Sequence, residues 1–220
     1  MNGEQWLHVE ASAPVARLLL AHGAGAPMDS GFMDALAEAL AGEGIATSRF
    51  EFPYMAEYRH GGRKRPPDRQ ERLLECWRRH YLSALDRQRF AGETLPLLIG
   101  GKSLGGRMAS LIADDLGASG LCCFGYPFHP PAKPDSLRIG HLMAIETPTL
   151  FVQGDRDPFG HRGELRNLEL STAIRIHWLD DGDHDFKPRK RSGRTQEQLI
   201  GEAARATRGF AVALQGSLRP

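Results

Sequence analysis

The sequence predicts a single α/β domain in which helices cover both faces of a mainly parallel β-sheet. Short apolar runs alternate with longer amphipathic segments along the 220 residues, and this alternation is typical of such a sheet. The chain is too short for two domains of ordinary size, and neither an internal repeat nor a linker divides it. We therefore expect one domain over residues 1–220.

The first part of the chain is expected to supply three strands and a helix. These are the strands 5–10, 15–21 and 45–52 and a helix ending near residue 42. Asp29 or Ser30 is expected to cap this helix, because both residue types commonly occupy that position. Two glycines at its end favour termination there.

The middle of the chain is expected to begin with a long loop. Residues 53–67 are rich in glycine, proline and charge, which disfavours regular structure. Apolar residues at helical spacing then predict a helix over 68–89, and a fully apolar run predicts a strand over 96–100. A further helix is expected over 104–116.

The last hundred residues repeat the alternation of strand and helix. Apolar runs predict strands over 121–124, 147–153 and 174–179. Segments with helical spacing predict helices over 163–171 and 195–214.

The segment Gly-Lys-Ser-Leu-Gly at 101–105 matches the G-x-S-x-G nucleophile elbow, in which a serine lies on a sharp strand-to-helix turn. Small neighbouring residues allow the backbone to bend this tightly. An apolar strand precedes the motif and a helical pattern follows it, so the flanking segments match the strand-to-helix context that the elbow requires. Ser103 is therefore the expected nucleophile; an incidental serine in a glycine turn is the alternative.

Gly-Lys-Ser also ends the phosphate-binding P-loop, which requires a glycine five residues before its last glycine. This chain has Pro96 at that position, and the intervening residues belong to a strand. The P-loop is excluded.

A serine nucleophile needs a base, and the base needs an acid that orients it. In folds with this elbow the acid and the histidine follow the serine in the chain. Asp157 is the preferred acid, because it lies a turn beyond the strand 147–153 and precedes Pro158; Asp155 is the alternative. His184, in the polar loop after the next strand, is the expected base, with a surface histidine as the alternative.

Such chemistry requires no cofactor, and no metal site is expected. Asp181, Asp183 and Asp185 alternate as in a calcium loop, but Phe186 replaces the required glycine and Ser192 replaces the closing glutamate.

The oxyanion hole is expected to consist of two backbone N–H groups. Leu104, which follows the serine, should donate one. Ala24 or Gly25, in the His-Gly-Ala-Gly segment after the strand 15–21, should donate the other, and Ala24 is preferred.

The substrate pocket is expected at the carboxyl ends of the strands, where ligands bind in open α/β sheets. Its expected walls, with ordinary loop packing as the alternative, are Met28, Tyr126, Phe128 and Phe159. The interval between Ser103 and Asp157 is too short for an inserted cap domain, which predicts a shallow, open site. The basic loop 59–65, with Lys102 and Arg107, would attract an anionic acyl group or serve as a solvated surface.

Several segments together resemble one family. They include Leu-Leu-Leu-Ala-His-Gly-Ala-Gly-Ala-Pro, Gly-Gly-Lys-Ser-Leu-Gly-Gly-Arg-Met-Ala-Ser, Gly-Tyr-Pro-Phe-His-Pro-Pro and Gln-Gly-Asp-Arg-Asp-Pro-Phe-Gly. The chain resembles, over roughly residues 15–212, the small α/β-hydrolase family related to dienelactone hydrolases. That family also contains a testis-expressed vertebrate homologue and the hydrolase-like region of a chromatin complex subunit.

The resemblance implies an α/β-hydrolase fold and a triad of Ser103, Asp157 and His184, but it implies no substrate. Dienelactone hydrolases use a cysteine nucleophile where this chain has a serine, and this difference argues against dienelactone as the substrate. We expect a serine hydrolase of the carboxylesterase type (EC 3.1.1) that acts on small or exposed esters. A non-catalytic, partner-binding protein and an acyltransferase with the same triad are the alternatives.

The composition limits the other partners. A net charge of +1, with 41% hydrophobic and 25% charged residues, provides no overall attraction to nucleic acid or to an anionic membrane. No apolar run approaches the roughly eighteen residues that a membrane span requires. The three cysteines lack metal-ligand spacing, and a reducing cytoplasm is the expected compartment. A small-molecule ester is thus the expected partner, and the sequence carries no signal of an oligomeric state.

Overall fold

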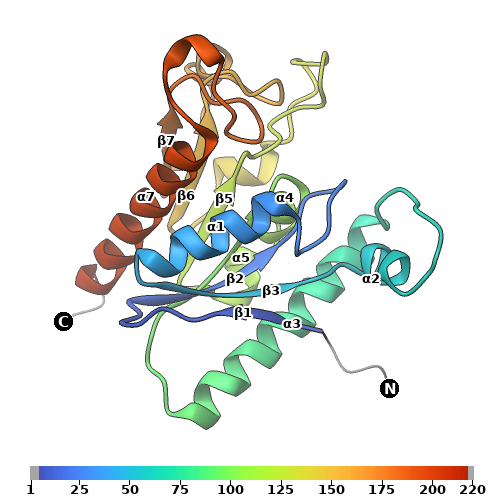
Figure 1. Ribbon diagram of the computed structural model, residues 1–220, viewed down its shortest axis with the longest axis vertical. Helices are drawn as coiled ribbons and strands as arrows, with labels where there is room; N and C mark the ends of the chain where they lie inside the picture. Colours follow the sequence, from blue (N-terminus) through green and yellow to red (C-terminus); the bar gives the residue numbers. More distant parts are fainter. Residues whose placement is uncertain (1–4, 218–220) are drawn as a thin grey trace.

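A seven-stranded sheet with helices on both faces forms the centre of the computed structural model, which describes residues 5–217 (Figure 1). The strand order is β1-β3-β2-β4-β5-β6-β7. β1 pairs antiparallel to β3, and the other neighbouring pairs in the described sheet are parallel. The strands are β1 (Leu7–Val9), β2 (Ala16–Ala21), β3 (Ile45–Phe50), β4 (Leu97–Lys102), β5 (Gly120–Phe124), β6 (Thr149–Gly154) and β7 (Ile174–Leu179).

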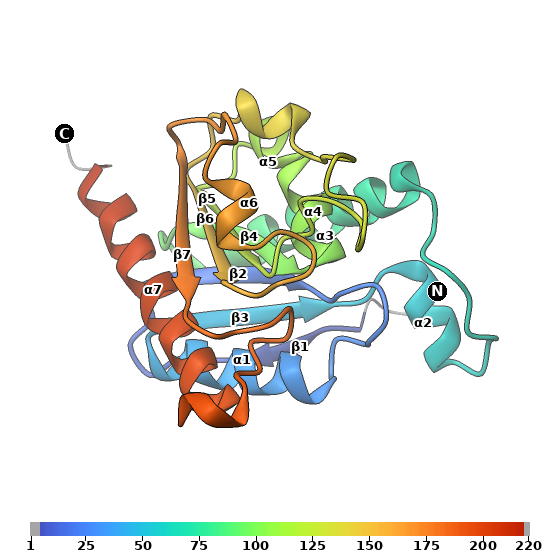
Figure 2. The ribbon, with the colours of Figure 1, turned by 90° about the horizontal axis from the view of Figure 1, so that it is seen from above.

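The α-helices form two layers, one on each side of this sheet (Figure 2). They are α1 (Gly31–Gly42), α2 (Pro53–Arg59), α3 (Gln70–Ala91), α4 (Leu104–Ser110), α5 (Ala113–Leu116), α6 (Arg162–Leu165) and α7 (Gln196–Ser217). Two short 3-10 helices, η1 (Gly140–Met143) and η2 (Lys190–Ser192), lie in connections. α1 packs against α7 on one face, and α3 packs against α4 on the other. The predicted fold class is confirmed.

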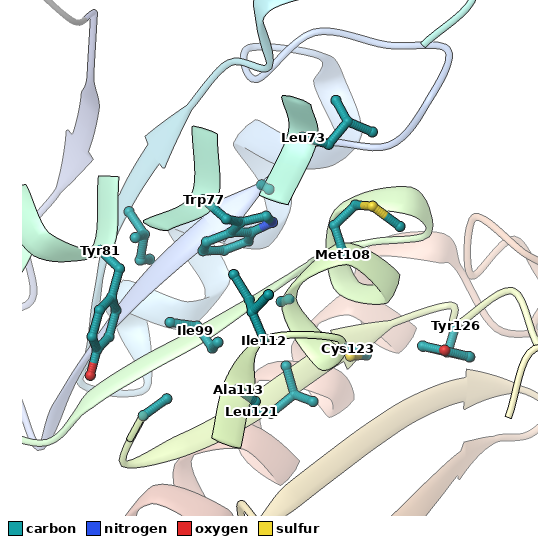
Figure 3. Packing of buried hydrophobic residues seen from close by; sticks show 14 of the residues in the cluster. Leu73, Trp77, Tyr81, Ile99, Met108, Ile112, Ala113, Leu121, Cys123 and Tyr126 are labelled. Atoms are coloured by element: carbon teal, nitrogen blue, oxygen red, sulfur yellow. The ribbon is translucent and has the colours of Figure 1, made fainter. Parts of the chain in front are cut away.

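Each face of the sheet has its own hydrophobic core, because successive residues of a strand point to opposite sides. In β2, Leu19 faces the core under α3 and α4, whereas Leu18 and Leu20 face α1 and α7. Figure 3 shows the first core, in which Trp77 of α3 and Ile112, just after α4, lie over the sheet. Burial on both faces explains why the central strands β2, β4, β5 and β6 are largely apolar instead of alternating.

The adjacent cysteines of β5 follow the same rule. Cys122 belongs to one core and Cys123 to the other, and neither side chain is exposed. Both are free thiols whose pKa is raised by burial. They are small packing residues, as the sequence indicates.

The predicted loop over 53–67 is wrong in its first half, where the chain forms α2. Pro53 occupies the first turn, where its missing N–H costs no helical hydrogen bond. The next amide, of Tyr54, donates to Asp68 Oδ2 at 3.0 Å, which satisfies a free N–H of the helix start.

Two predicted helices are shorter than expected. The helix over 104–116 divides into α4 and α5, because the Ser110 hydroxyl donates to the Arg107 carbonyl at 2.8 Å and the next amides bond three residues back instead of four. The helix over 163–171 is reduced to α6, after which the Ser171 amide donates to the Leu142 carbonyl. None of the helices in residues 5–217 is both long and apolar enough to cross a bilayer.

Candidate active site

Ser103 lies on a strained turn between β4 and α4. Its φ of 49° and ψ of −112° lie in a region that residues other than glycine rarely occupy. The Ser103 amide donates to the Phe124 carbonyl at 3.0 Å, which holds the turn against the end of β5. This is the backbone geometry expected of a nucleophile elbow.

The elbow packs so closely on β2 that its glycines cannot carry side chains. A Cβ at Gly101 would lie 2.6 Å from the Ala21 carbonyl oxygen. A Cβ at Gly105 would lie 2.5 Å from the same oxygen and 2.7 Å from that of His22. The G-x-S-x-G pattern therefore reflects backbone-to-backbone contact as well as the turn itself.

Asp157 and His184 meet at the same end of the sheet, at the carboxyl ends of β6 and β7. His184 Nδ1 lies 2.8 Å from Asp157 Oδ2, and the aspartate side chain is completely buried. Asp157 also accepts hydrogen bonds from the Phe159 amide (2.9 Å) and from Gln153 Nε2 (3.0 Å). With Nδ1 donating to the carboxylate, Nε2 of a neutral His184 is free to accept a proton.

The structure thus brings Asp157, and not Asp155, against the histidine. Asp155 Oδ1 is buried and has no hydrogen-bond partner among the residues described. The two aspartates follow the same strand, but the turn directs only the second toward His184.

Gly125 lies at the point where the elbow and the histidine loop come close together. A Cβ at this residue, which has a φ of 66°, would lie 3.2 Å from His184 Nδ1 and 3.1 Å from Lys102 Nζ. The preceding carbonyl, of Phe124, accepts the Ser103 amide. Ser103 and His184 therefore lie on either side of the end of β5.

The segment expected to complete the oxyanion hole is held by hydrogen bonds to its carbonyl groups. His22 Nδ1 lies 2.6 Å from the Gly23 oxygen, and the Tyr54 hydroxyl donates to the Ala24 oxygen at 3.0 Å. His22 Nε2 accepts the Phe52 amide at 3.1 Å, so its proton is on Nδ1, and burial lowers the pKa of this histidine. In a trans peptide the N–H points away from the preceding C=O, so these bonds also orient the amides of Ala24 and Gly25.

Three of the four expected pocket walls are placed differently from the prediction. Phe159 is half-buried and its ring centroid lies 4.3 Å from that of His184, as a wall residue would. Met28, Tyr126 and Phe128 are instead fully buried. The two aromatic rings pack against Phe151 of β6, so the loop after β5 turns inward and its rings join the core.

Lys102 has a position that its sequence context does not reveal. Its side chain is only 8% exposed, and Nζ donates to the His184 carbonyl at 2.7 Å and lies 3.4 Å from Asp185 Oδ1. Burial lowers the pKa of this ammonium, and the Asp185 and Asp157 carboxylates oppose that effect. Lys102 thus connects the elbow to the backbone of the histidine loop and is not available to a substrate anion.

Two of the four arginine and lysine side chains of the basic loop 59–65 are engaged in ion pairs. Arg59 pairs with Asp29 and Glu51, and Arg65 pairs with Glu57 and Asp68. Within the part of the chain that the structure describes, no three His, Cys, Asp or Glu side chains are arranged to hold a metal ion.

Comparison with known proteins agrees with this architecture. The family model of the alpha/beta hydrolase domain matches residues 14–212. The chain belongs to the α/β-hydrolase family. No curated protein matches this α/β-hydrolase in sequence.

Solved structures share its fold at low sequence identity. An α/β serine hydrolase homologue from Coxiella burnetii has a TM-score of 0.67 at 16% identity, over 92% of this chain and 90% of the other. A serine hydrolase without a lid from Xanthomonas campestris has a TM-score of 0.65 at 16% identity, over 96% of each chain. A dienelactone hydrolase from Anabaena variabilis has a TM-score of 0.57 at 19% identity, over 94% and 90%. These similarities establish the fold.

Proposed function

We propose that this α/β-hydrolase is a serine acyl hydrolase of the carboxylesterase type (EC 3.1.1), with Ser103 as nucleophile, His184 as base and Asp157 as the acid that orients it. The proposal is carried by one juxtaposition. A serine on a strained, positive-φ turn lies across the end of β5 from a histidine that is hydrogen-bonded to a buried aspartate. Few arrangements other than nucleophilic catalysis require all of these features at one edge of a sheet.

The mechanism follows from the hydrogen bond between His184 Nδ1 and Asp157, which leaves Nε2 for the proton transfer. His184 Nε2 accepts the Ser103 proton while the hydroxyl oxygen attacks the ester carbonyl. The amides of Leu104 and of Ala24 or Gly25 stabilise the oxyanion, and the protonated histidine then gives its proton to the leaving alcohol. Water repeats these steps on the acyl-enzyme, with Asp157 stabilising the imidazolium throughout.

Small or exposed esters are the proposed substrates. The connection between β5 and β6, where a cap would be inserted, contains only η1 as a helix in the described chain. The Xanthomonas campestris structure is likewise described as lacking a lid. Without a cap there is no deep channel to hold a long acyl chain.

The test compares hydrolysis of p-nitrophenyl butyrate by the wild type and three variants. Ser103→Ala and Asp157→Asn are expected to lower kcat at least about a thousandfold, because each removes a member of the triad. Asp155→Asn is the matched control and should retain activity, since Asp155 does not contact His184. Hydrolysis that survives Ser103→Ala would contradict the mechanism.

Four further expectations belong to this proposal. If the protein is an acyltransferase, a new ester should form when an alcohol competes with water for the acyl-enzyme. If the folded protein shows no activity, the partner-binding alternative is supported. None of the three cysteines, which all lie in the described part of the chain, forms a disulfide, and this supports a reducing, cytoplasmic location. Kinship with the testis-expressed and chromatin-complex homologues is proposed on the sequence motifs alone.

A further inference from the structure

The loop that follows β2 lies directly against the nucleophile elbow. A Cβ at Gly23 would lie 3.7 Å from Ser103 Cβ, so the backbone of this loop runs beside the seryl side chain. Among the residues described, the amides of Ala24, Gly25 and Leu104 donate to no acceptor of the protein. Three backbone N–H groups around the elbow are therefore free to bind an oxygen atom of a substrate.

Two consecutive carbonyl groups of this loop turn toward one side chain, that of Tyr54 at the start of α2, which lies next to the loop (Figure 2). The Tyr54 hydroxyl donates to the Ala24 oxygen at 3.0 Å and to the Gly23 oxygen at 3.3 Å. The tyrosine is only 2% exposed. Burial raises the pKa of its hydroxyl, which therefore keeps its proton at neutral pH and remains a donor.

The direction of the two carbonyl groups fixes the direction of the two amides that follow them. In a trans peptide the N–H points away from the C=O, so the amides of Ala24 and Gly25 both point away from Tyr54. Successive N–H groups on one side of the backbone form a concavity that binds anions. The bonds to one hydroxyl thus favour both amides as donors, where the sequence leaves a choice between them.

The two ends of the loop are held by other side chains. His22 Nδ1 donates to the Gly23 oxygen at 2.6 Å. At the far end, Met28 is bonded through both its amide and its carbonyl to side chains at the end of β3. In the described chain the Ala24 carbonyl accepts a hydrogen bond from Tyr54 alone. Removing this hydroxyl would therefore free the middle of the loop while its ends stay in place.

We propose that Tyr54 is a positioning residue for the attack by Ser103, because its hydroxyl turns the Ala24 and Gly25 amides together toward the oxyanion. This inference rests on the proposed function, since it concerns the same site. Without the hydroxyl, the Ala24 carbonyl is able to rotate toward the substrate, where it would repel the oxyanion instead of leaving the Gly25 amide to bind it.

The first test is the steady-state hydrolysis of p-nitrophenyl butyrate by Tyr54→Phe, which removes one oxygen atom and keeps the ring. Its kcat is expected to fall at least about tenfold while KM stays within about twofold, because the lost bond affects the transition state and not the ground state. Tyr81→Phe is the matched control and should keep the wild-type kcat. Tyr81 is also buried, and its hydroxyl forms no hydrogen bond among the residues described.

The second test measures the stability of the oxyanion itself, which a merely structural role of Tyr54 would not change. With 1,1,1-trifluorohexan-2-one, the Ser103 oxygen bonds to the carbonyl carbon, the carbonyl π electrons move to its oxygen, and the serine proton passes to His184. Fluorine NMR at a series of pH values gives the pKa of the resulting hemiketal oxygen. In Tyr54→Phe this pKa should rise by about one unit, which corresponds to the tenfold loss in kcat.

The outcomes separate this inference from the proposed function. If Ser103→Ala abolishes hydrolysis but Tyr54→Phe keeps the wild-type kcat and the wild-type hemiketal pKa, the role of Tyr54 is overturned and the esterase stands. A fall in kcat with an unchanged hemiketal pKa would likewise overturn it. A folded wild type that neither hydrolyses the ester nor adds to the ketone would reject the proposed function, and this inference with it.

Discussion

At the scale of single residues, Lys102 bears most directly on the proposed reaction. Lysine is rarely buried, yet its ammonium group lies beneath the histidine loop and bonds the His184 carbonyl. That bond joins residues that are 82 positions apart in the chain. We propose that Lys102 is a positioning residue that holds His184, the proposed base, in register with Ser103, the proposed nucleophile.

Lys102→Met is expected to lower kcat about tenfold while KM stays within about twofold, because it removes a charge-assisted hydrogen bond that orients His184 without removing a substrate contact. Stability should change little, since the cost of burying the ammonium is lost together with its bond. Steady-state kinetics and urea denaturation measure the two effects. A variant with wild-type kcat would show that Lys102 does not position the base.

His141 makes the stability of the fold depend on pH. Burial, and then the positive charge of Arg107, lower its pKa to about 4 from the usual 6.5. Between pH 6.5 and pH 4, His141 is therefore protonated in the unfolded chain but not in the folded chain. The free energy of unfolding falls as the pH drops from about 6.5 to 4. The loss is limited to about 1.4 kcal/mol per pH unit, and partial exposure of the ring reduces it.

His141→Gln removes this contribution. Its free energy of unfolding should fall less than that of the wild type between pH 7 and pH 4.5, as measured by urea denaturation at each pH. Parallel curves for the two proteins would contradict the assignment.

At the scale of elements, the contact between the elbow and β2 depends on the absence of side chains. Gly105→Ala should destabilise the protein by about 3 kcal/mol, because the new Cβ would lie 2.5 Å from the Ala21 oxygen. Gly209→Ala is the matched control in α7, where nothing lies within 4 Å, and should stabilise by about 1 kcal/mol. Thermal denaturation of both variants tests the pair, and equal effects would refute this account of the elbow.

The accuracy of the sequence predictions also differs among elements. The central strands β2, β4, β5 and β6 were predictable because burial on both faces makes them largely apolar. α2 was missed because its stability depends on Asp68, which caps it across a loop, and the kink after α4 depends on one serine hydroxyl. The first contact crosses a loop and the second is a local side-chain bond within one turn, and neither leaves a periodic pattern in the sequence.

The same distinction applies to the candidate site. The placement of Ser103, Asp157 and His184 at one end of the sheet could be predicted, because each follows a strand that ends there. The burial of Tyr126 and the tether of Lys102 could not, because both depend on how loops from different strands pack together.

At the scale of the whole molecule, the absence of an inserted cap predicts how activity depends on acyl length. Among p-nitrophenyl esters, kcat/KM is expected to be highest for short chains and to fall beyond about six carbons, because an open edge of the sheet cannot bury a longer tail. Activity that rises steadily up to twelve carbons would require an enclosed acyl channel.

The central claim is that Ser103 is an activated nucleophile, and covalent labelling tests it most directly. The protein is incubated with a fluorophosphonate at neutral pH, and the modified peptide is mapped by mass spectrometry. The account predicts one adduct, on Ser103, that forms at least about a hundredfold more slowly in His184→Gln. A folded wild-type protein that forms no adduct, or an adduct on another residue that persists in Ser103→Ala, would contradict it.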